Sequence, residues 1–355
     1  MGDVLSRREI LAGIAAVGAC AFLPTGRSLA QTAPSSRRVI DVHHHIVPPK
    51  YMAAHKEDEI RGGAGQPYVL AWTPQVSLEE MDAAGVATSI LSVSTPGTWF
   101  GSVEDGRRTS RLVNEYAAGM VRDYPGRFGF FAAIPLPDTE GSLKEIEYAF
   151  ETLKADGVGL MTSYDTTPLG DKQFTPVFDE LNRRKCTIFI HRTAATCCLN
   201  LRQLNGNQEF IVDDLRMLNS LLTSGALARY SDIRWIHAHG DKVLAWVAKL
   251  NGAPLNGPGR GGTNPAWAPE GVQHELKKVY VDSAGNTKYS MDELRKLGML
   301  TDRVMFGTDV PWGNVPNSLA SLRTRMGLSQ AEIASVEYET ALKLFPRLAA
   351  NRSAL

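Results

Sequence analysis

The sequence predicts an α/β fold, a single (β/α)8 barrel of the TIM type. Short apolar or β-branched runs alternate with amphipathic helical stretches, and this alternation favours a parallel sheet. The chain of 355 residues offers eight such units, which match the count and size of this barrel. An open doubly wound sheet is the alternative, but it is expected to carry a glycine-rich loop after its first strand. Here that strand is followed by Val47, Pro48 and Pro49 instead.

The predicted strands are short and each is bounded by turn residues. In chain order they are 39–46, 88–94, 128–134, 157–162, 186–191, 233–239, 279–284 and 304–309. Two segments, 47–77 and 252–272, are rich in Gly, Pro and polar residues. We expect both to be long loops or insertions, not domain linkers, at places where a barrel keeps its binding residues.

Helical periodicity fills the intervals between the strands. Examples are residues 141–154, 211–229 and 329–346. Ser329 and Glu332 have the spacing of a capping box, so the last of these helices is expected to begin at that serine.

Residues 1–30 are predicted to be a twin-arginine signal peptide. Arg7 and Arg8 precede an apolar stretch at 11–23, and Ser28 and Ala30 provide the small residues that a signal peptidase reads. The apolar stretch is too short to span a bilayer. The prediction implies recognition by the twin-arginine export machinery, a periplasmic location and one mature domain at 31–355. An ordinary first helix, or a lipoprotein anchored through Cys20, is the alternative.

Composition excludes several classes of function. The 38 basic residues balance the 38 acidic ones, so no charge excess favours nucleic acid, and no later stretch is long and apolar enough for a membrane helix. Four cysteines do not make a disulfide scaffold in a chain of this length. Removal of residues 1–30 leaves Cys186 and the adjacent Cys197 and Cys198. That pair could form a strained vicinal disulfide, but we expect buried apolar packing.

Ionisable side chains gather at the carboxyl ends of the predicted strands, where a barrel carries its chemistry. His43 and His45 share one face of the first strand, and His191 ends the fifth. Asp309 ends the eighth strand. Three imidazoles and a carboxylate at neighbouring strand ends predict a site for one divalent metal ion.

The remaining histidines receive other assignments. His239, at the end of the sixth strand, is expected to act as acid or base, since its ordinary pKa lies near neutrality. His237 has the parity of His239 but sits deeper, so it is expected in the core. His44 should pack behind the barrel wall. His55 and His274 are expected in solvated loops.

The chain resembles the amidohydrolase-related group typified by aminocarboxymuconate-semialdehyde decarboxylase. The resemblance covers residues 38–345 and rests on an ordered set of motifs. They are Ile40-Asp41-Val42-His43-His44-His45, His191, Ala238-His239-Gly240 and Gly307-Thr308-Asp309. The stretches 91–97, 125–128 and 136–138 are similar to the 6-methylsalicylate decarboxylase branch.

The resemblance implies a mononuclear metal-dependent decarboxylase on a barrel of the metal-dependent hydrolase superfamily, and relatives are often homodimers. It implies ligation by His43, His45, His191 and Asp309, with zinc expected and manganese as the alternative. A lysine that bridges two metals in some barrels is missing from the fourth strand, which ends at Thr162 and Ser163.

These observations lead to a hypothesis for the reaction. The enzyme would remove CO₂ from an ortho-hydroxybenzoate-like or muconate-like carboxylic acid, with His239 or Asp309 delivering the proton. A zinc-dependent hydrolase of a lactone, amide or ester is the alternative, and a binder that has lost catalysis is a third reading. Asp282 is expected to orient a metal ligand or to cap the following segment.

Substrate contacts are assigned to Arg192, Trp99 and Phe100. Arg192 could pair with a substrate carboxylate or form a surface salt bridge, and the two aromatic residues could form an apolar wall, ordinary loop packing or a subunit contact. Arg192 stands where relatives usually carry proline, and Asp241 and Lys242 stand where glycine is more usual. These departures bear on the substrate more than on the metal.

Overall fold

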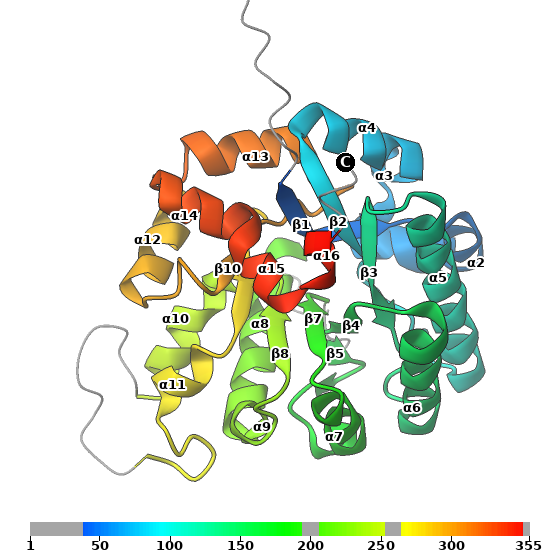
Figure 1. The fold of residues 1–355 in the computed structure, drawn as a ribbon. Helices are drawn as coiled ribbons and strands as arrows, with labels where there is room; N and C mark the ends of the chain where they lie inside the picture. Colours follow the sequence, from blue (N-terminus) through cyan, green and yellow to red (C-terminus); the bar gives the residue numbers. More distant parts are fainter. Residues whose placement is uncertain (1–37, 194–205, 253–263, 351–355) are drawn as a thin grey trace, which may run out of the picture. The chain divides into compact units, whose positions relative to one another are not determined.

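The computed structural model of the chain describes residues 38–193, 206–252 and 264–350. These residues belong to one compact unit, Ser36–Leu355, which holds an eight-stranded parallel sheet with helices around it (Figure 1). The (β/α)8 prediction is confirmed. The signal-peptide prediction, Cys20, and the pair Cys197 and Cys198 lie outside the described residues.

The strands of the barrel follow one another in chain order around the sheet. They are β1 (Val39–Ile46), β2 (Val86–Val93), β3 (Phe128–Ala133), β4 (Gly157–Met161), β7 (Thr187–His191), β8 (Arg234–His237), β9 (Tyr280–Asp282) and β10 (Val304–Met305). The first and last strands close the ring, since Val42 N donates to Phe306 O at 2.9 Å and His45 N to Val310 O at 2.7 Å. A small hairpin, β5 (Ser163–Tyr164) with β6 (Thr167–Pro168), follows β4.

Helices surround the strands. They are α2 (Pro49–Glu59), α3 (Pro67–Leu70), α4 (Pro74–Ala84), α5 (Val103–Asp123), α6 (Thr139–Tyr148), α7 (Thr175–Arg183), α8 (Gly206–Thr223), α9 (Ala226–Arg229), α10 (Asp241–Leu250), α11 (Val272–Leu276), α12 (Lys288–Lys296), α13 (Val315–Thr324), α14 (Gln330–Ala334), α15 (Thr340–Leu344) and α16 (Arg347–Ala350). Short π turns follow α2, α6 and α14, and a 3₁₀ turn precedes α7. The predicted capping box of Ser329 and Glu332 is present at the start of α14. No described helix has the length and apolar character needed to cross a bilayer.

Of the two alternatives for residues 47–77, a long loop or an insertion, the structure shows an insertion between β1 and β2. The segment is mostly helical and holds α2, α3 and the start of α4. Pro49, Pro67 and Pro74 each stand in the first turn of one of these helices. Proline is favoured there because its missing N–H would have no helical partner. The prolines of this segment, which are also typical of loops, therefore mark the starts of helices.

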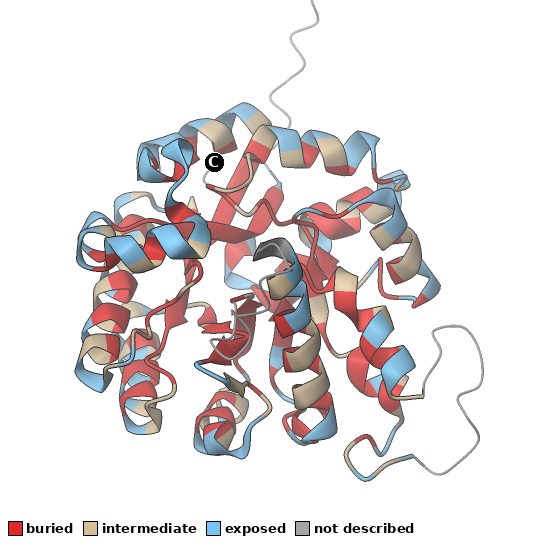
Figure 2. Ribbon diagram, turned by 180° about the vertical axis from the view of Figure 1, so that it is seen from behind, coloured by how far each residue is buried: buried red, intermediate tan, exposed pale blue. Residues whose placement is uncertain are grey.

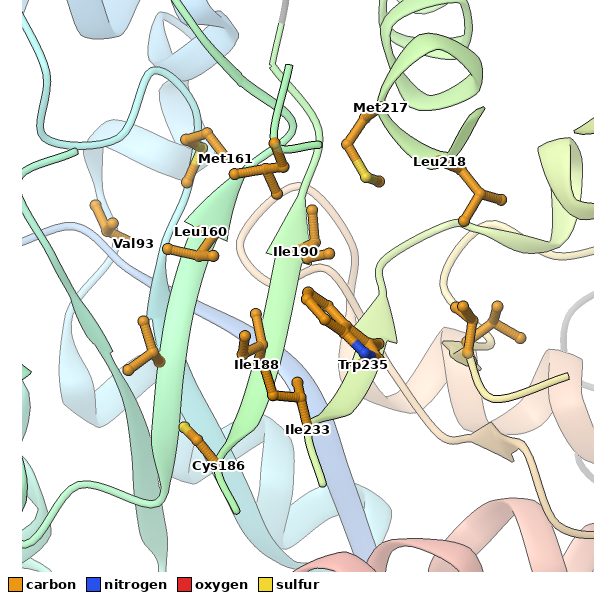
Figure 3. Packing of buried hydrophobic residues seen from close by; sticks show 14 of the residues in the cluster. Val93, Leu160, Met161, Cys186, Ile188, Ile190, Met217, Leu218, Ile233 and Trp235 are labelled. Carbon is orange, nitrogen blue, oxygen red and sulfur yellow. The ribbon is translucent and has the colours of Figure 1, made fainter. Parts of the chain in front are cut away.

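The core has two layers, and the strands of the barrel are buried along most of their length while the helices are buried mainly on their inner sides (Figure 2). Between barrel and helices, side chains of β4, β7 and β8 such as Leu160, Ile188 and Trp235 share an apolar cluster with Met217 of α8 (Figure 3). Inside the barrel a second cluster gathers residues from most strands, and Phe345 after α15 joins it. The C-terminal helices therefore cover the amino ends of the strands, and the carboxyl ends are left for the site.

A bulge in β1 determines which of its side chains face the barrel interior. Asp41 pairs with Ser89 and His44 with Leu91, so β1 has one residue more than β2 over this interval. Val42 belongs to the apolar cluster inside the barrel. The next residue, His43, also faces inward, and its ring centroid lies 5.1 Å from that of Phe189. Because a bulge shifts the two-residue alternation by one, apolar core and metal ligands can share the inner face of a single strand.

Candidate metal and active site

Three imidazoles and one carboxylate converge at the carboxyl end of the barrel. One ligand atom each from His43, His45, His191 and Asp309 lies within 4.8 Å of the others. His43 Nε2 and His45 Nε2 are 2.9 Å apart, and each lies 3.2 Å from Asp309 Oδ1. The predicted ligand set is thus assembled from β1, β7 and the segment after β10.

Two further side chains hold the ligand rings in place. Asp282 Oδ2, at the end of β9, lies 2.7 Å from His43 Nδ1. Ser92 Oγ of β2 lies 3.0 Å from His45 Nδ1. A ring nitrogen held in this way leaves the other nitrogen, Nε2, to face the ligand cluster. The position of Asp282 agrees with its predicted orienting role, whereas Ser92 was not singled out, although it has the parity of the inward-facing Ile90.

Electrostatics of the cluster favour a cation. Burial lowers the pKa of His45 to about 4, and burial together with the neighbouring imidazoles of His45 and His43 holds the pKa of His191 well below its ordinary value. Burial acts on His43 in the same direction, but Asp282 and Asp309 outweigh it and raise its pKa to about 10. The carboxylates that favour a proton on His43 favour a metal ion among the same atoms.

His191 provides the test of whether the site fits a metal. The side chain is buried, and neither of its ring nitrogens has a hydrogen-bond partner among the described residues. A buried imidazole without partners is costly in water-free surroundings unless an ion or ligand engages it. Its ring lies 4.4 Å from that of His45, centroid to centroid. Neutral imidazoles with an ionised carboxylate are a suitable donor set for zinc or manganese.

His239 reaches the site through an unusual backbone. His237 points outward, and its Nε2 lies 2.9 Å from Asp214 Oδ1 on α8. Residues i and i+2 of a regular strand point the same way, so a continued strand would have turned His239 outward as well. Its φ of 55° ends the strand and brings the ring to the cavity, where Nε2 lies 3.5 Å from Asp309 Oδ2. Nδ1 lies 2.9 Å from Ala284 O, and a carbonyl only accepts, so Nδ1 carries a proton. Asp309 also has positive φ, 63°.

The outcomes for the other histidines differ. His44 packs behind the wall as expected and contacts Asp41 and Ser77 at 3.0 and 2.8 Å. His237 is buried as expected. The expectation for His55 was wrong, because this residue is buried on α2 and stacks on Phe100 at 3.8 Å between centroids. His274 is exposed as expected, but lies on α11.

None of the three predicted substrate residues is among the described residues that line the cavity beside His239 and Asp309. Arg192 is largely buried, and Nη2 lies 3.2 Å from Asp214 Oδ2, so it forms neither a surface salt bridge nor a cavity wall. Trp99 donates to Asp165 at 2.9 Å, and Phe100 stacks on His55. Arg192 follows His191 directly, and successive residues of a strand point to opposite faces, which explains why it contacts α8.

An open cavity of about 610 Å³ adjoins His239 and Asp309. Trp312 lines it, and this ring meets His45 edge to face at 5.6 Å between centroids. The contacts of Trp99 with Asp165 and of Phe100 with His55 agree with loop packing, which was one of the alternatives for these two residues. The lining of the cavity comes from α3, α4, α13 and the segments after β8, β9 and β10, and includes no Lys or Arg among the described residues.

Comparisons with known proteins agree with this geometry. The amidohydrolase family model matches residues 40–347. The decarboxylase yanB of Aspergillus niger is 34% identical, with 87% of each chain covered. The 6-methylsalicylic acid decarboxylase of Penicillium expansum is 32% identical, with 87% of this chain and 96% of that protein covered. The fold also matches that of a dihydroxybenzoic acid decarboxylase from a Polaromonas species, which was solved with bound manganese and 2-nitroresorcinol. The TM-score is 0.68 at 19% identity, and the match covers 87% of this chain and 97% of that chain.

Proposed function

The chain belongs to the amidohydrolase family, and on that premise we propose that it is a metal-dependent decarboxylase of a small aromatic acid with a hydroxyl group ortho to the carboxylate. The observation that carries the proposal is the convergence of His43, His45, His191 and Asp309 beside His239, whose Nε2 lies 3.5 Å from Asp309 Oδ2. The decarboxylase names of the relatives favour loss of CO₂ over the alternative, hydrolysis of a lactone, amide or ester.

His43, His45, His191 and Asp309 would hold the metal ion, which would supply Lewis-acid polarisation of the carboxylate and its ortho hydroxyl group. We propose one ion for each chain, zinc first and manganese as the alternative. The described lining of the cavity includes no Lys or Arg, and a metal ion at the ligand cluster would supply the positive charge that an anionic substrate favours.

His239 and Asp309 are the residues proposed to transfer the proton. Decarboxylation breaks the bond from the ring to the carboxyl carbon and leaves the electron pair on the ring carbon, which must gain a proton. His239 holds one proton on Nδ1 against Ala284 O, so a second proton on Nε2 is the one it can deliver. Asp309 Oδ2, 3.5 Å away, stabilises the charged ring and can share that proton. Trp312 would flank the substrate ring beside His45.

The test is an assay of CO₂ release from a panel of salicylates, dihydroxybenzoates and muconates by protein loaded with zinc or manganese. We expect release from at least one hydroxylated aromatic acid and a product lighter by CO₂. A product that has gained water supports the hydrolase instead. Absence of bound metal together with absence of activity after addition of either ion contradicts the proposal.

We also propose twin-arginine export to the periplasm and a homodimer. The sequence of residues 1–30 supports the first, and the resemblance to the family supports the second. Replacement of Arg7 and Arg8 by lysine should keep the full-length chain in the cytoplasmic fraction of a host with this machinery, whereas the parent chain should appear in the periplasm with a mature N-terminus near residue 31. Light scattering measures the oligomeric state.

A further inference from the structure

The cavity extends well beyond the space that a single aromatic ring requires. A methylated hydroxybenzoic acid has roughly 11 non-hydrogen atoms, and at a generous ~30 Å³ for each it fills about 330 Å³. The described cavity measures about 610 Å³. With the ring beside Trp312 and Asp309, a large part of the cavity remains on the side of α13.

That side of the cavity is one face of a helix. Asn314, Asn317, Ser318 and Ser321 line the cavity at a spacing of three, four and seven residues, which places them on the same face of α13. The side chains of the last three make no hydrogen bond to any described residue. Serines leave room for a ligand where larger residues would fill the space.

The only carboxylate on this wall is already engaged. Glu80 of α4 accepts hydrogen bonds from Asn314 Nδ2 at 2.8 Å and from Val315 N at 2.9 Å. The Glu80 carboxylate therefore holds the start of α13 in place, and its negative charge interacts favourably with the helix N-terminus. Described lining residues include no Lys or Arg, so the wall offers hydrogen bonds without an available charge.

Asn286 gives an independent indication of a ligand with a donor group. It lines the same cavity and is only 8% exposed. Its Nδ2 donates to Asp282 O at 3.1 Å, which fixes the amide, while its Oδ1 has no hydrogen-bond partner among the described residues. A buried acceptor without a donor costs about 1–3 kcal/mol, so a ligand hydroxyl or N–H would be stabilised here.

We propose that the substrate is an aromatic hydroxy acid with an uncharged, hydrogen-bonding extension that lies between Asn286 and the polar face of α13. This inference rests on the proposed function and specifies its substrate class. A second carboxylate on the extension would approach Glu80, and no Lys or Arg is among the described lining residues. A purely alkyl extension would leave Asn286 Oδ1 unpaired. A hydroxyalkyl or phenolic extension fits both conditions.

The experiment compares four acids on the metal-loaded full chain: one single-ring ortho-hydroxybenzoate and its hydroxyalkyl, alkyl and carboxyalkyl derivatives. We expect kcat/KM for the hydroxyalkyl acid to exceed that for each of the other three at least tenfold. Ser321→Leu should lower kcat/KM for the hydroxyalkyl acid at least tenfold more than for the single-ring acid. Ala320→Leu, on the exposed face of the same helix, should change neither. Asn286→Leu should remove the preference for hydroxyalkyl over alkyl.

Calorimetric binding of the same acids to the His239→Ala variant separates the two proposals. Tighter binding of the hydroxyalkyl acid without CO₂ release from any acid by the parent enzyme keeps the inference and overturns the decarboxylase function. CO₂ release with no preference among the four acids, or an equal loss for both acids in Ser321→Leu, overturns the inference and leaves the decarboxylase function standing.

Discussion

His239 combines a reactive ring with a left-handed backbone. Only a few per cent of residues other than glycine adopt positive φ, and histidine and aspartate are among those that tolerate it best. His239 and Asp309 both do so, at the two positions where strands stop and side chains must turn into the cavity. Local strain of about 1 kcal/mol or more at each position is held by the surrounding hydrogen bonds, such as that from Asp309 N to His43 O.

A first prediction concerns the role of His239. Because it lies at the edge of the ligand cluster and delivers a proton, His239→Ala should lower kcat at least about 100-fold and leave the metal content unchanged. His274→Ala, an exposed control on α11, should change neither. Elemental analysis and the CO₂ assay measure both quantities, and loss of metal from His239→Ala would instead identify a fifth ligand.

Asp282 and Ser92 permit a second prediction. The carboxylate at 2.7 Å from His43 Nδ1 both orients the ring and compensates charge, whereas the hydroxyl at 3.0 Å from His45 Nδ1 only orients. Asp282→Asn should therefore weaken metal affinity about 10–100-fold, and Ser92→Ala less. Competition with a chelator measures both affinities. Equal affinity in Asp282→Asn and the parent would show that the contact does not act on the metal.

Glu59 predicts the pH dependence of stability. Tyr51 Oη lies 2.6 Å from Gly97 O and also contacts Glu59 Oε1. The carbonyl only accepts, so the hydroxyl proton goes to Gly97 and Glu59 must be protonated to complete the second hydrogen bond. Burial raises the pKa of Glu59 to about 8, so the native state binds this proton more tightly than the unfolded state, and stability falls as pH rises from about 4.5 to 8.

The variant Glu59→Gln should not show this fall in stability with rising pH, because the amide does not ionise. The free energy of unfolding of the parent relative to the variant should fall by up to about 1.4 kcal/mol for each pH unit in that window, and by nothing further above it. Glu57→Gln, an exposed control on the same helix, should follow the parent. Urea unfolding at pH 5, 6.5 and 8 measures the difference, and parallel curves for Glu59→Gln and the parent would contradict a buried neutral carboxyl.

At the scale of elements, α8 is joined to two strands by one carboxylate. Asp214 contacts Arg192 after β7 and His237 of β8 and is fully buried. Removal of one member of a buried charge pair leaves the others uncompensated, so Asp214→Ala should lower the free energy of unfolding by about 3 kcal/mol or more. Glu147→Gln, an exposed change on α6, should have little effect. A normal unfolding curve for Asp214→Ala would show that the contacts add no stability.

Elements differ in how far the sequence could predict them. All eight strands were located within a few residues because buried parallel strands are nearly continuous apolar runs. The ends were less predictable: β10 stops at Met305, and Asp309 takes a left-handed turn fixed by the carbonyl of His43, a partner 266 residues earlier. The bulge in β1 and the turn at His239 likewise depend on tertiary contacts, whereas the outward direction of Arg192 follows from strand alternation after His191.

At the scale of the whole molecule, the metal should stabilise the barrel. A ligand that binds only the native state adds about 4 kcal/mol when present at 1,000 times its dissociation constant. Removal of the ion with a chelator should therefore lower the thermal midpoint by several degrees and abolish activity, and zinc or manganese should restore both. An unchanged midpoint after complete removal, measured by calorimetry and elemental analysis, would contradict a site that couples three parts of the barrel.

The closure of the ring between β1 and the segment after β10 has a consequence for the order of events during synthesis. Asp309 emerges from the ribosome 264 residues after His45, and therefore long after the first two imidazoles. The complete donor set therefore exists only after the last strand has docked against the first. Nascent chains of increasing length should acquire tight metal binding abruptly, once residues beyond Val310 have left the exit tunnel. Metal capture would then report that the chain has finished folding.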